Sequence, residues 1–190
     1  MNGEPSEVTE QVAPEHCTCD ALVLGCGNRL FGDDGFGPAV ARRLREMPDL
    51  PPGLCVIDAG TSVRVVLFDV LLGPIRPRKV VVVDAVDMGR SPGEVWCIDA
   101  DDLPAIKRDD FSMHQVPTSN MLRELSALGG VDVTCVVGQA SGFPDQVHPV
   151  LSDVVRDAVD RAAETVLNVC RRPREGGAFA GPAGADVERP

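Results

Sequence analysis

The chain has 190 residues, a hydrophobic fraction of 44% and a formal net charge of −11 at pH 7. A chain of this length usually forms one domain, and this hydrophobic fraction is sufficient for a substantial core. The acidic balance argues against a nucleic-acid partner, because binding to phosphates requires clusters of Lys and Arg. It argues equally against an anionic membrane surface, and no apolar run approaches the roughly 18 residues that a membrane span needs.

The seven cysteines indicate a reducing compartment. Their number is odd, no C-x-x-C pair occurs, and most of them lie in apolar runs, which does not suit a disulfide framework. The segment His16-Cys17-Thr18-Cys19 lacks the second ligand pair of a typical structural zinc site, so it is weak evidence for zinc. The N-terminal residues also lack the basic region and apolar core of a signal peptide. We therefore expect a cytoplasmic protein.

Polar composition at both ends separates a central domain from its flanks. Residues 1–19 predict a flexible leader, residues 171–190 a disordered tail, and residues 20–170 a single α/β domain. In chain order, the sequence of this domain predicts a strand over Ala21–Cys26, a helix over Gly35–Met47, a strand over Leu54–Asp58, a helix over Ser62–Leu72, strands over Lys79–Asp84 and Glu94–Ile98, a helix over Thr118–Leu128, a strand over Val131–Gly138 and a helix over Leu151–Cys170. The alternation predicts a mostly parallel sheet with helices on both faces, and the fourth strand is expected to be antiparallel.

The first strand leads into a glycine-rich turn that carries two adjacent carboxylates, Asp33 and Asp34. A phosphate-binding P-loop would have Lys and a hydroxyl residue at these positions, and a dinucleotide-binding turn would have Gly instead of Leu30. Carboxylates near a helix N-terminus repel phosphate and attract cations. The turn therefore predicts a site for a metal or another cation, with Asp33 or Asp34 as the cap of the following helix.

Acidic residues follow or end three of the predicted strands. Asp34 follows the first strand, while Asp58 and Asp84 end the second and third. Ligands of open α/β sheets bind at the carboxyl ends of the strands. A single Asp in such a place is usually a turn or cap residue, but three gathered carboxylates repel one another unless a cation or a proton joins them.

Of the three histidines, His114 is the best candidate to complete such a site, because it lies in a loop just before a predicted helix. Two carboxylates and an imidazole suit a divalent transition metal and leave coordination positions open for substrate or water. No G-x-S-x-G elbow occurs, and no Ser or Cys has an evident His partner. Nucleophilic catalysis is therefore unsupported.

These segments resemble the maturation endopeptidases of nickel-iron hydrogenases. The resemblance covers residues 20 to 170 and rests on the stretch Gly25-Cys26-Gly27-Asn28-Arg29-Leu30-Phe31-Gly32-Asp33-Asp34-Gly35-Phe36-Gly37, on Asp58-Ala59-Gly60-Thr61, on the Val-rich strand into Asp84-Ala85, and on Ser112-Met113-His114-Gln115. The branch that serves deazaflavin-coenzyme-reducing hydrogenases looks most similar. The leader cysteines and the polar tail have no counterpart in the family pattern.

The resemblance implies a three-layer α/β/α sandwich around a twisted, mostly parallel five-stranded sheet with one antiparallel strand. It also implies an endopeptidase that removes the C-terminal extension of a large-subunit precursor after nickel insertion. By matching motifs, Asp34, Asp58 and His114 would recognise the nickel, which the substrate supplies, and no organic cofactor is expected. Some members have Glu at the position of Asp34. Asp33 would be a cap or a supporting group, and Asp84 would either support the site or simply end its strand.

Two other functions remain open from the sequence. One is a metal-dependent hydrolase of small molecules that holds its own zinc or manganese, and the other is a non-enzymatic, nickel-sensing maturation adaptor. The favoured partner is the nickel-loaded large-subunit precursor. The sequence does not determine the oligomeric state, and a monomer is favoured.

Overall fold

The computed structural model describes residues 19–73, 76–99, 102, 116–127 and 130–173. Its centre is a five-stranded sheet of order β2-β1-β3-β5-β4. The strands are β1 (Ala21–Cys26), β2 (Leu54–Gly60), β3 (Lys79–Val86), β4 (Val95–Asp99) and β5 (Asp132–Gln139). All neighbouring pairs are parallel except β4 and β5, which are antiparallel. The expected mixed sheet with one antiparallel strand is confirmed.

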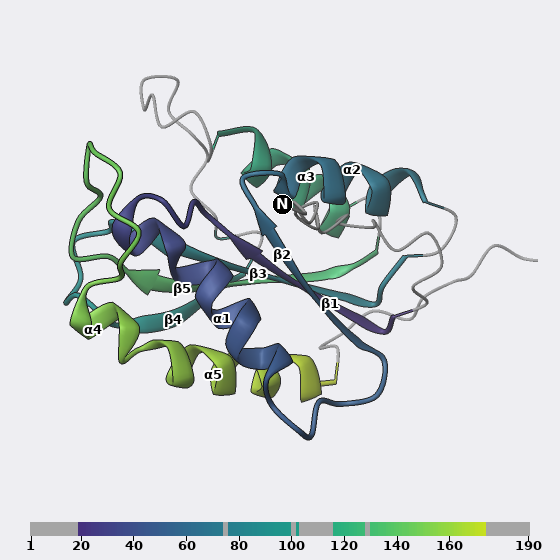
Figure 1. Cartoon of the computed structure of the whole chain (residues 1–190). Helices are drawn as coiled ribbons and strands as arrows, with labels where there is room; N and C mark the ends of the chain where they lie inside the picture. The colour runs from purple at the N-terminus through teal and green to yellow at the C-terminus, as the bar shows by residue number, and fades with distance from the viewer. Residues whose placement is uncertain (1–18, 74–75, 100–101, 103–115, 128–129, 174–190) are drawn as a thin grey trace, which may run out of the picture.

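Helices cover both faces of this sheet (Figure 1). They are α1 (Phe36–Arg45), α2 (Val63–Leu72), α3 (Val116–Ala127), α4 (Asp153–Arg156) and α5 (Val159–Arg171), and a short 3-10 turn, η1 (Gly32–Gly35), precedes α1. Figure 1 shows α2 and α3 on one face and α1 and α5 on the other, which is the expected three-layer sandwich. None of the helices in the described ranges is long and apolar enough to cross a membrane.

The run of valines in β3 belongs to two separate cores. Val80 and Val82 pack in the cluster under α2 and α3, whereas Val81 and Val83 pack in the cluster under α1 and α5. Successive side chains of a strand point to opposite faces of the sheet. When helices cover both faces, successive side chains are all buried and are therefore apolar. This explains why an uninterrupted apolar run marks the centre of the sheet.

Several boundaries differ from the sequence prediction. Strands β2 and β3 continue two residues beyond Asp58 and Asp84, so neither carboxylate ends its strand. Neither Asp33 nor Asp34 caps α1: Gly35 occupies the cap position, and both carboxylates lie in the preceding 3-10 turn. The expected role of these two residues as helix caps was therefore wrong.

The last predicted helix is divided into α4 and α5. The Ala158 N–H donates to the Val155 carbonyl, three residues back, and tightens the helix there. Val155 of α4 and Ala158, which precedes α5, are both fully buried. The tighter turn places both side chains in the core under α1 and α5. The predicted leader and tail lie outside the described residues except for Cys19 and residues 171–173, of which Arg171 still belongs to α5. Their state and the domain limits remain predictions.

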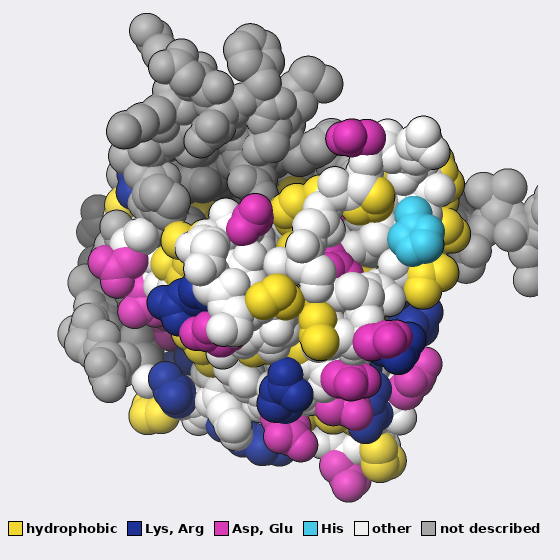
Figure 2. Space-filling model, turned by 90° about the vertical axis from the view of Figure 1, so that its left-hand side faces the viewer, with side chains coloured by type: hydrophobic (Ala, Val, Ile, Leu, Met, Phe, Trp, Pro, Cys, Tyr) yellow, Lys and Arg dark blue, Asp and Glu magenta, His cyan; other side chains and the backbone are white. Residues whose placement is uncertain are grey.

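The first turn of α1 lies directly on the backbone of the sheet. A Cβ atom at Gly37 would be 2.3 Å from the carbonyl oxygens of both Cys26 and Val83, and one at Gly25 would be 2.4 Å from the Gly37 carbonyl oxygen. Only glycine permits this approach. The contact fixes the turn between β1 and α1 at the carboxyl ends of the strands, the side of the molecule that faces the viewer in Figure 2.

We expect Gly37→Ala to destabilise the fold by about 3 kcal/mol, because the new methyl group would meet backbone atoms of two strands that cannot move aside. Ala39→Gly, two residues further along the same helix and also buried, provides the control and should cost only about 1 kcal/mol. Denaturant unfolding of the two variants measures the difference. Equal losses would show that the helix can move away from the sheet.

Candidate functional site

The turn after β1 is built around Asn28. Its side-chain oxygen accepts the Leu30 N–H at 3.0 Å, and its carbonyl oxygen accepts the Phe31 N–H at 3.1 Å. The Asn28 N–H itself donates to the Asp34 carboxylate at 2.9 Å. These bonds fold the chain back so that Asp34, which follows the turn, lies over its beginning.

Gly27 makes this folding back possible. Its φ of +116° lies in a region that other residues rarely adopt, and a Cβ atom there would be 1.9 Å from the Asp34 carbonyl oxygen. The Gly27 N–H also donates to the Gly60 carbonyl at 3.1 Å. The turn is therefore joined to the end of β2 as well as to η1.

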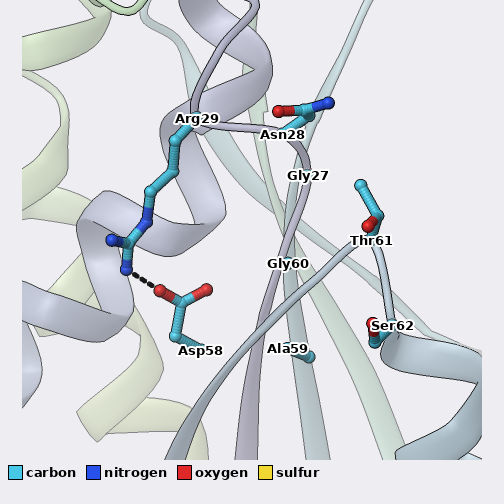
Figure 3. Close-up of a pocket in the computed structure, with 8 residues that line it drawn as sticks. All are labelled: Gly27, Asn28, Arg29, Asp58, Ala59, Gly60, Thr61 and Ser62. Atoms are coloured by element: carbon cyan, nitrogen blue, oxygen red, sulfur yellow. Dashed lines mark ion pairs between the residues drawn. The ribbon is translucent and has the colours of Figure 1, made fainter. Parts of the chain in front are cut away.

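Asp58 lies on β2 opposite Gly25, and only 11% of its side chain is exposed. The pairing of β1 and β2 slips by one residue just after this position, so that Cys26 pairs with Gly60. The Asp58 carboxylate forms an ion pair with Arg29, whose side chain is 59% exposed (Figure 3).

A pocket of about 370 Å³ lies where β1 and β2 end, and Figure 3 shows the residues around it. The turn after β1 and the end of β2 together supply its lining residues, which are Gly27, Asn28, Arg29, Asp58, Ala59, Gly60, Thr61 and Ser62. Its walls thus combine backbone groups, hydroxyl groups and one ion pair.

Asp34 lies against Gly27 and Asp58 lies against Gly60, and these two glycines are joined by a hydrogen bond. A Cβ atom at Gly27 would lie 3.3 Å from Asp34 Oδ1, and one at Gly60 would lie 3.9 Å from Asp58 Oδ1. The structure therefore brings the two predicted carboxylates to one place. The third predicted residue, His114, lies outside the described residues. Within the described ranges, no three His, Cys, Asp or Glu side chains form a group that could hold a metal ion.

Asp84, on the neighbouring strand β3, lies close enough to Asp34 for the two carboxylates to interact electrostatically. Its partial burial, and then the negative charge of Asp34, raise the pKa of its carboxyl group to about 7. The Ala85 N–H donates to Asp84 Oδ1 at 2.8 Å and partly offsets that effect. Asp84 therefore holds a proton at slightly acidic pH, which reduces the repulsion among the carboxylates.

Cys26, at the end of β1, does not have the properties of a nucleophile. Burial, and then the charge of Asp84, raise the pKa of its thiol well above the ordinary value. The thiolate is the reactive form of cysteine, and this environment disfavours it. The structure agrees with the sequence in giving no support to cysteine catalysis at this place.

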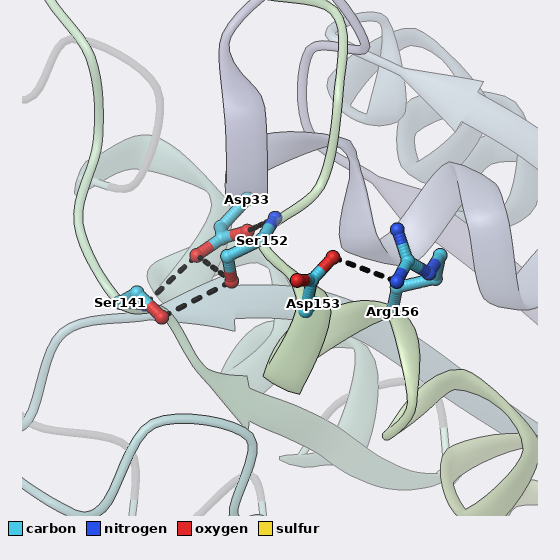
Figure 4. Close-up of polar contacts among 5 residues, drawn as sticks. All are labelled: Asp33, Ser141, Ser152, Asp153 and Arg156. Atoms are coloured by element: carbon cyan, nitrogen blue, oxygen red, sulfur yellow. Dashed lines mark hydrogen bonds and ion pairs between the residues drawn. The ribbon is translucent and has the colours of Figure 1, made fainter.

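Asp33 has a structural role rather than a role in the pocket. It is 2% exposed, and its carboxylate accepts hydrogen bonds from the Ser141 N–H at 2.8 Å, the Ser152 N–H at 2.7 Å and the Ser152 hydroxyl at 2.9 Å (Figure 4). Backbone bonds between the turn and His148 add to this contact: the Gly32 N–H donates to the His148 carbonyl at 2.7 Å, and the His148 N–H donates to the Leu30 carbonyl at 2.8 Å. The segment 140–152 is thereby fastened to the turn.

Sequence reasoning did not identify Arg29, Ser141 or Ser152 as partners of the carboxylates. Ser141 and Ser152 are more than 100 residues from Asp33 in the chain, and their contact depends on how the segment after β5 returns to η1. Arg29 is visible in the turn motif, but its partner is on another strand. No spacing within the sequence indicates either contact.

Comparisons with known proteins match the same part of the chain. A family model described as hydrogenase maturation protease matches residues 38–169. A Methanocaldococcus jannaschii protein provisionally named as a hydrogenase maturation protease is 41% identical over 155 residues, which are 80% of this chain and 97% of the relative. Coenzyme F420 hydrogenase subunit delta of Methanothermobacter thermautotrophicus is 35% identical over 152 residues, which are 78% of this chain and 93% of the relative.

Solved structures agree with these relatives. The hydrogenase maturating endopeptidase HybD from E. coli superimposes with a TM-score of 0.64 at 26% sequence identity, and the match covers 80% of this chain and 91% of that one. A crystal structure of a hydrogenase 3 maturation protease matches with a TM-score of 0.60 at 27% identity, covering 80% of this chain and 90% of that one.

We expect Asp33→Ala to destabilise the protein by about 3 kcal/mol, because three partly buried hydrogen bonds would lose their charged acceptor. Ser141→Ala provides the control, since its backbone N–H still reaches Asp33 and only an exposed hydroxyl contact is lost, which should cost about 1 kcal/mol or less. Denaturant unfolding distinguishes the two. A mild effect of Asp33→Ala would mean that the segment 140–152 does not depend on this carboxylate.

The raised pKa of Asp84 predicts a pH-dependent stability. Between the ordinary value of 3.8 and about 7, the folded protein binds this proton more tightly than the unfolded chain does, so the free energy of unfolding falls as pH rises through this window. Asp84→Asn cannot titrate and should lack this fall. Relative to wild type, the variant should gain roughly 3 kcal/mol between about pH 5 and pH 8. Denaturant unfolding at both pH values measures this gain, and parallel pH profiles of variant and wild type would contradict the assignment.

Proposed function

This chain belongs to the hydrogenase maturation protease family, and from this membership we propose that it cuts the C-terminal extension from the large-subunit precursor of a nickel-iron hydrogenase once nickel is in place. The observation that carries the proposal is that Asp58 lines a pocket at the carboxyl ends of β1 and β2, while Asp34 lies against Gly27, another residue of the same lining. In α/β sheets this is the edge at which ligands bind.

The donor types at this edge fit a divalent cation. Carboxylate oxygens bind hard and intermediate metals, and an imidazole such as that of His114 would extend the preference to nickel. Two carboxylates and one imidazole leave several positions open, which the thiolates of the precursor would fill. In this proposal the nickel is therefore part of the substrate, and the protease recognises a precursor whose metal site is complete.

Each side chain then has a defined task. Asn28 holds the Asp34 carboxylate in position through its backbone N–H, and the slip in pairing after Gly25 sets the position of Asp58 relative to the turn. Bound nickel supplies polarisation of the scissile carbonyl and a lower pKa for a water molecule. Asp34 and Asp58 would orient the precursor by binding its metal, and a carboxylate oxygen that the metal leaves free would accept a proton from water. This makes the enzyme a carboxylate-dependent protease without a nucleophilic side chain.

The surface beside the pocket also suits a protein substrate. Leu30 in the turn and Phe143, Val147 and Val150 in the fastened segment are large apolar residues that are 43% to 64% exposed. Figure 2 shows hydrophobic side chains exposed between charged ones on this side of the molecule. Exposed apolar groups near a site favour contact with another protein over contact with a small polar molecule.

The nature of the precursor and the location of the reaction follow as parts of the proposal. The similarity to coenzyme F420 hydrogenase subunit delta favours the large subunit of a deazaflavin-reducing hydrogenase as the substrate. In this proposal the precursor is processed in the cytoplasm, a location that the cysteine pattern of the chain favours. The monomeric state expected from the sequence remains a prediction.

Purified protein incubated with nickel-loaded and nickel-free precursor tests the proposal, with intact-mass analysis as the readout. We expect loss of a C-terminal peptide from the nickel-loaded form only. Asp34→Asn, Asp58→Asn and His114→Ala should each slow the cleavage by about a hundredfold or more, because each removes a ligand or a proton acceptor. Asp49→Asn, an exposed acidic residue in the loop before β2, is the matched control and should cleave normally.

Other outcomes identify the alternatives. Nickel-dependent binding of the precursor without a change in mass would indicate a sensing adaptor. Cleavage of small esters or amides by protein that retains stoichiometric zinc or manganese would indicate a small-molecule hydrolase. Equal cleavage of nickel-free and nickel-loaded precursor would contradict recognition of the metal.

A further inference from the structure

Asp58 is a nearly buried carboxylate whose cationic partner is a solvent-exposed side chain. The Asp58 side chain is 11% exposed and the Arg29 side chain is 59% exposed. Among the described ion pairs, this one alone lies in the lining of the pocket. Figure 3 shows the arginine extending from the turn after β1 to the carboxylate on β2. The guanidinium thus covers the carboxylate that the proposed function assigns to nickel.

The Arg29 side chain can leave this position without a change in the turn. Hydrogen bonds hold the backbone on both sides of it, from the Asn28 N–H to Asp34 and from the Leu30 N–H to the Asn28 side chain. The backbone is also closely packed, since a Cβ atom at Gly35 would lie 3.3 Å from the Arg29 Cα. No other hydrogen bond of the guanidinium is present among the described residues. The mobile part is therefore the long side chain alone.

A guanidinium and a divalent cation compete for this carboxylate. Even if they contacted different oxygens of Asp58, two positive charges a few ångströms apart would repel each other. A half-exposed ion pair contributes only about 1 kcal/mol, which a doubly charged ion with further ligands exceeds. The Arg29–Asp58 ion pair therefore hinders a cation that binds weakly, but a cation that binds strongly can displace the guanidinium.

We propose that Arg29 is a placeholder cation that occupies Asp58 in the substrate-free enzyme and is displaced by the metal of the bound precursor. This inference rests on the proposed function, because it concerns the same carboxylate. Free nickel, which meets the site with few other contacts, has to displace Arg29 at the full cost of the pair. Nickel held by a docked precursor does so at a high effective concentration. Arg29 is thus a specificity-determining residue that favours metal delivered by the substrate over metal in solution.

Titration of nickel chloride into the substrate-free, tag-free protein by calorimetry tests this placeholder. Arg29→Gln removes the guanidinium and should tighten nickel binding roughly fivefold to tenfold, which corresponds to the loss of a competing pair of about 1 kcal/mol. Arg43→Gln is the matched control, because Arg43 pairs with Asp160 between α1 and α5 and its loss changes the net charge equally. It should leave nickel affinity unchanged.

A third variant locates the effect. In Arg29→Gln combined with Asp58→Asn, the gain in affinity should disappear, which excludes binding to the histidines and cysteines elsewhere in the chain. The inference would be overturned if Arg29→Gln bound nickel no more tightly than wild type, or if neither protein bound nickel detectably. An equal gain in the Arg43→Gln control would also overturn it. Thermal unfolding of each variant in the absence of nickel confirms that it is folded.

The inference and the proposed function fail separately. Cleavage of nickel-loaded precursor with no change of nickel affinity in Arg29→Gln would reject the placeholder and keep the protease. Tighter nickel binding by Arg29→Gln without any cleavage by wild type would keep the placeholder and reject the protease. Wild type and Arg29→Gln should also differ in selectivity, since only the variant is expected to lose precursor cleavage when excess free nickel is added.

Discussion

The contact between the first turn of α1 and the backbone of β1 and β3 is the constraint on which the site depends. Gly25 and Gly37 allow the helix to touch the sheet without intervening side chains. The chain between them then has only a short path, which it follows through Gly27, Asn28 and the 3-10 turn η1. This short path returns Asp34 to the end of β1, where Asp58 of β2 and Asp84 of β3 are its neighbours. A side chain at either glycine would separate the helix from the sheet and the carboxylates from one another.

Four carboxylates lie near this edge of the sheet and would repel one another, namely Asp33, Asp34, Asp58 and Asp84. A different partner stabilises each of them. Neutral donors of the segment 140–152 surround Asp33, and a backbone N–H holds Asp34. Arg29 pairs with Asp58, and a proton neutralises part of the Asp84 population near neutral pH. Of these partners, the guanidinium is the one that a substrate can replace without breaking the fold. Adjacent Asp33 and Asp34 therefore have different partners: Asp33 accepts from the segment 140–152, and Asp34 accepts from the turn after β1.

The sequence was sufficient to predict a mostly parallel sheet and the order of strands and helices along the chain, because the patterns that indicate each element are local. The apolar run Lys79–Asp84 and the alternation of strands and helices do not depend on distant residues. Asp34 and Asp58 could be proposed as site residues because parallel strands bring their carboxyl ends to one edge and because their motifs resemble those of the family, and their role in the site stays a prediction. The extension of β2 to Gly60, the division of the last helix at Ala158 and the partners of Asp33 were not found, because each depends on contacts between segments far apart in the chain. His114 lies outside the described residues, and its place in the site stays a prediction.

The proposed function requires that Asp34 and Asp58 bind the nickel of the precursor directly. X-ray absorption at the nickel edge, recorded on freeze-trapped complexes of precursor with protease, tests it most directly. We expect new oxygen or nitrogen neighbours of nickel when wild-type protease binds, and fewer of them when Asp34→Asn or Asp58→Asn is bound instead. A nickel spectrum that is the same in free precursor and in the wild-type complex would contradict the claim.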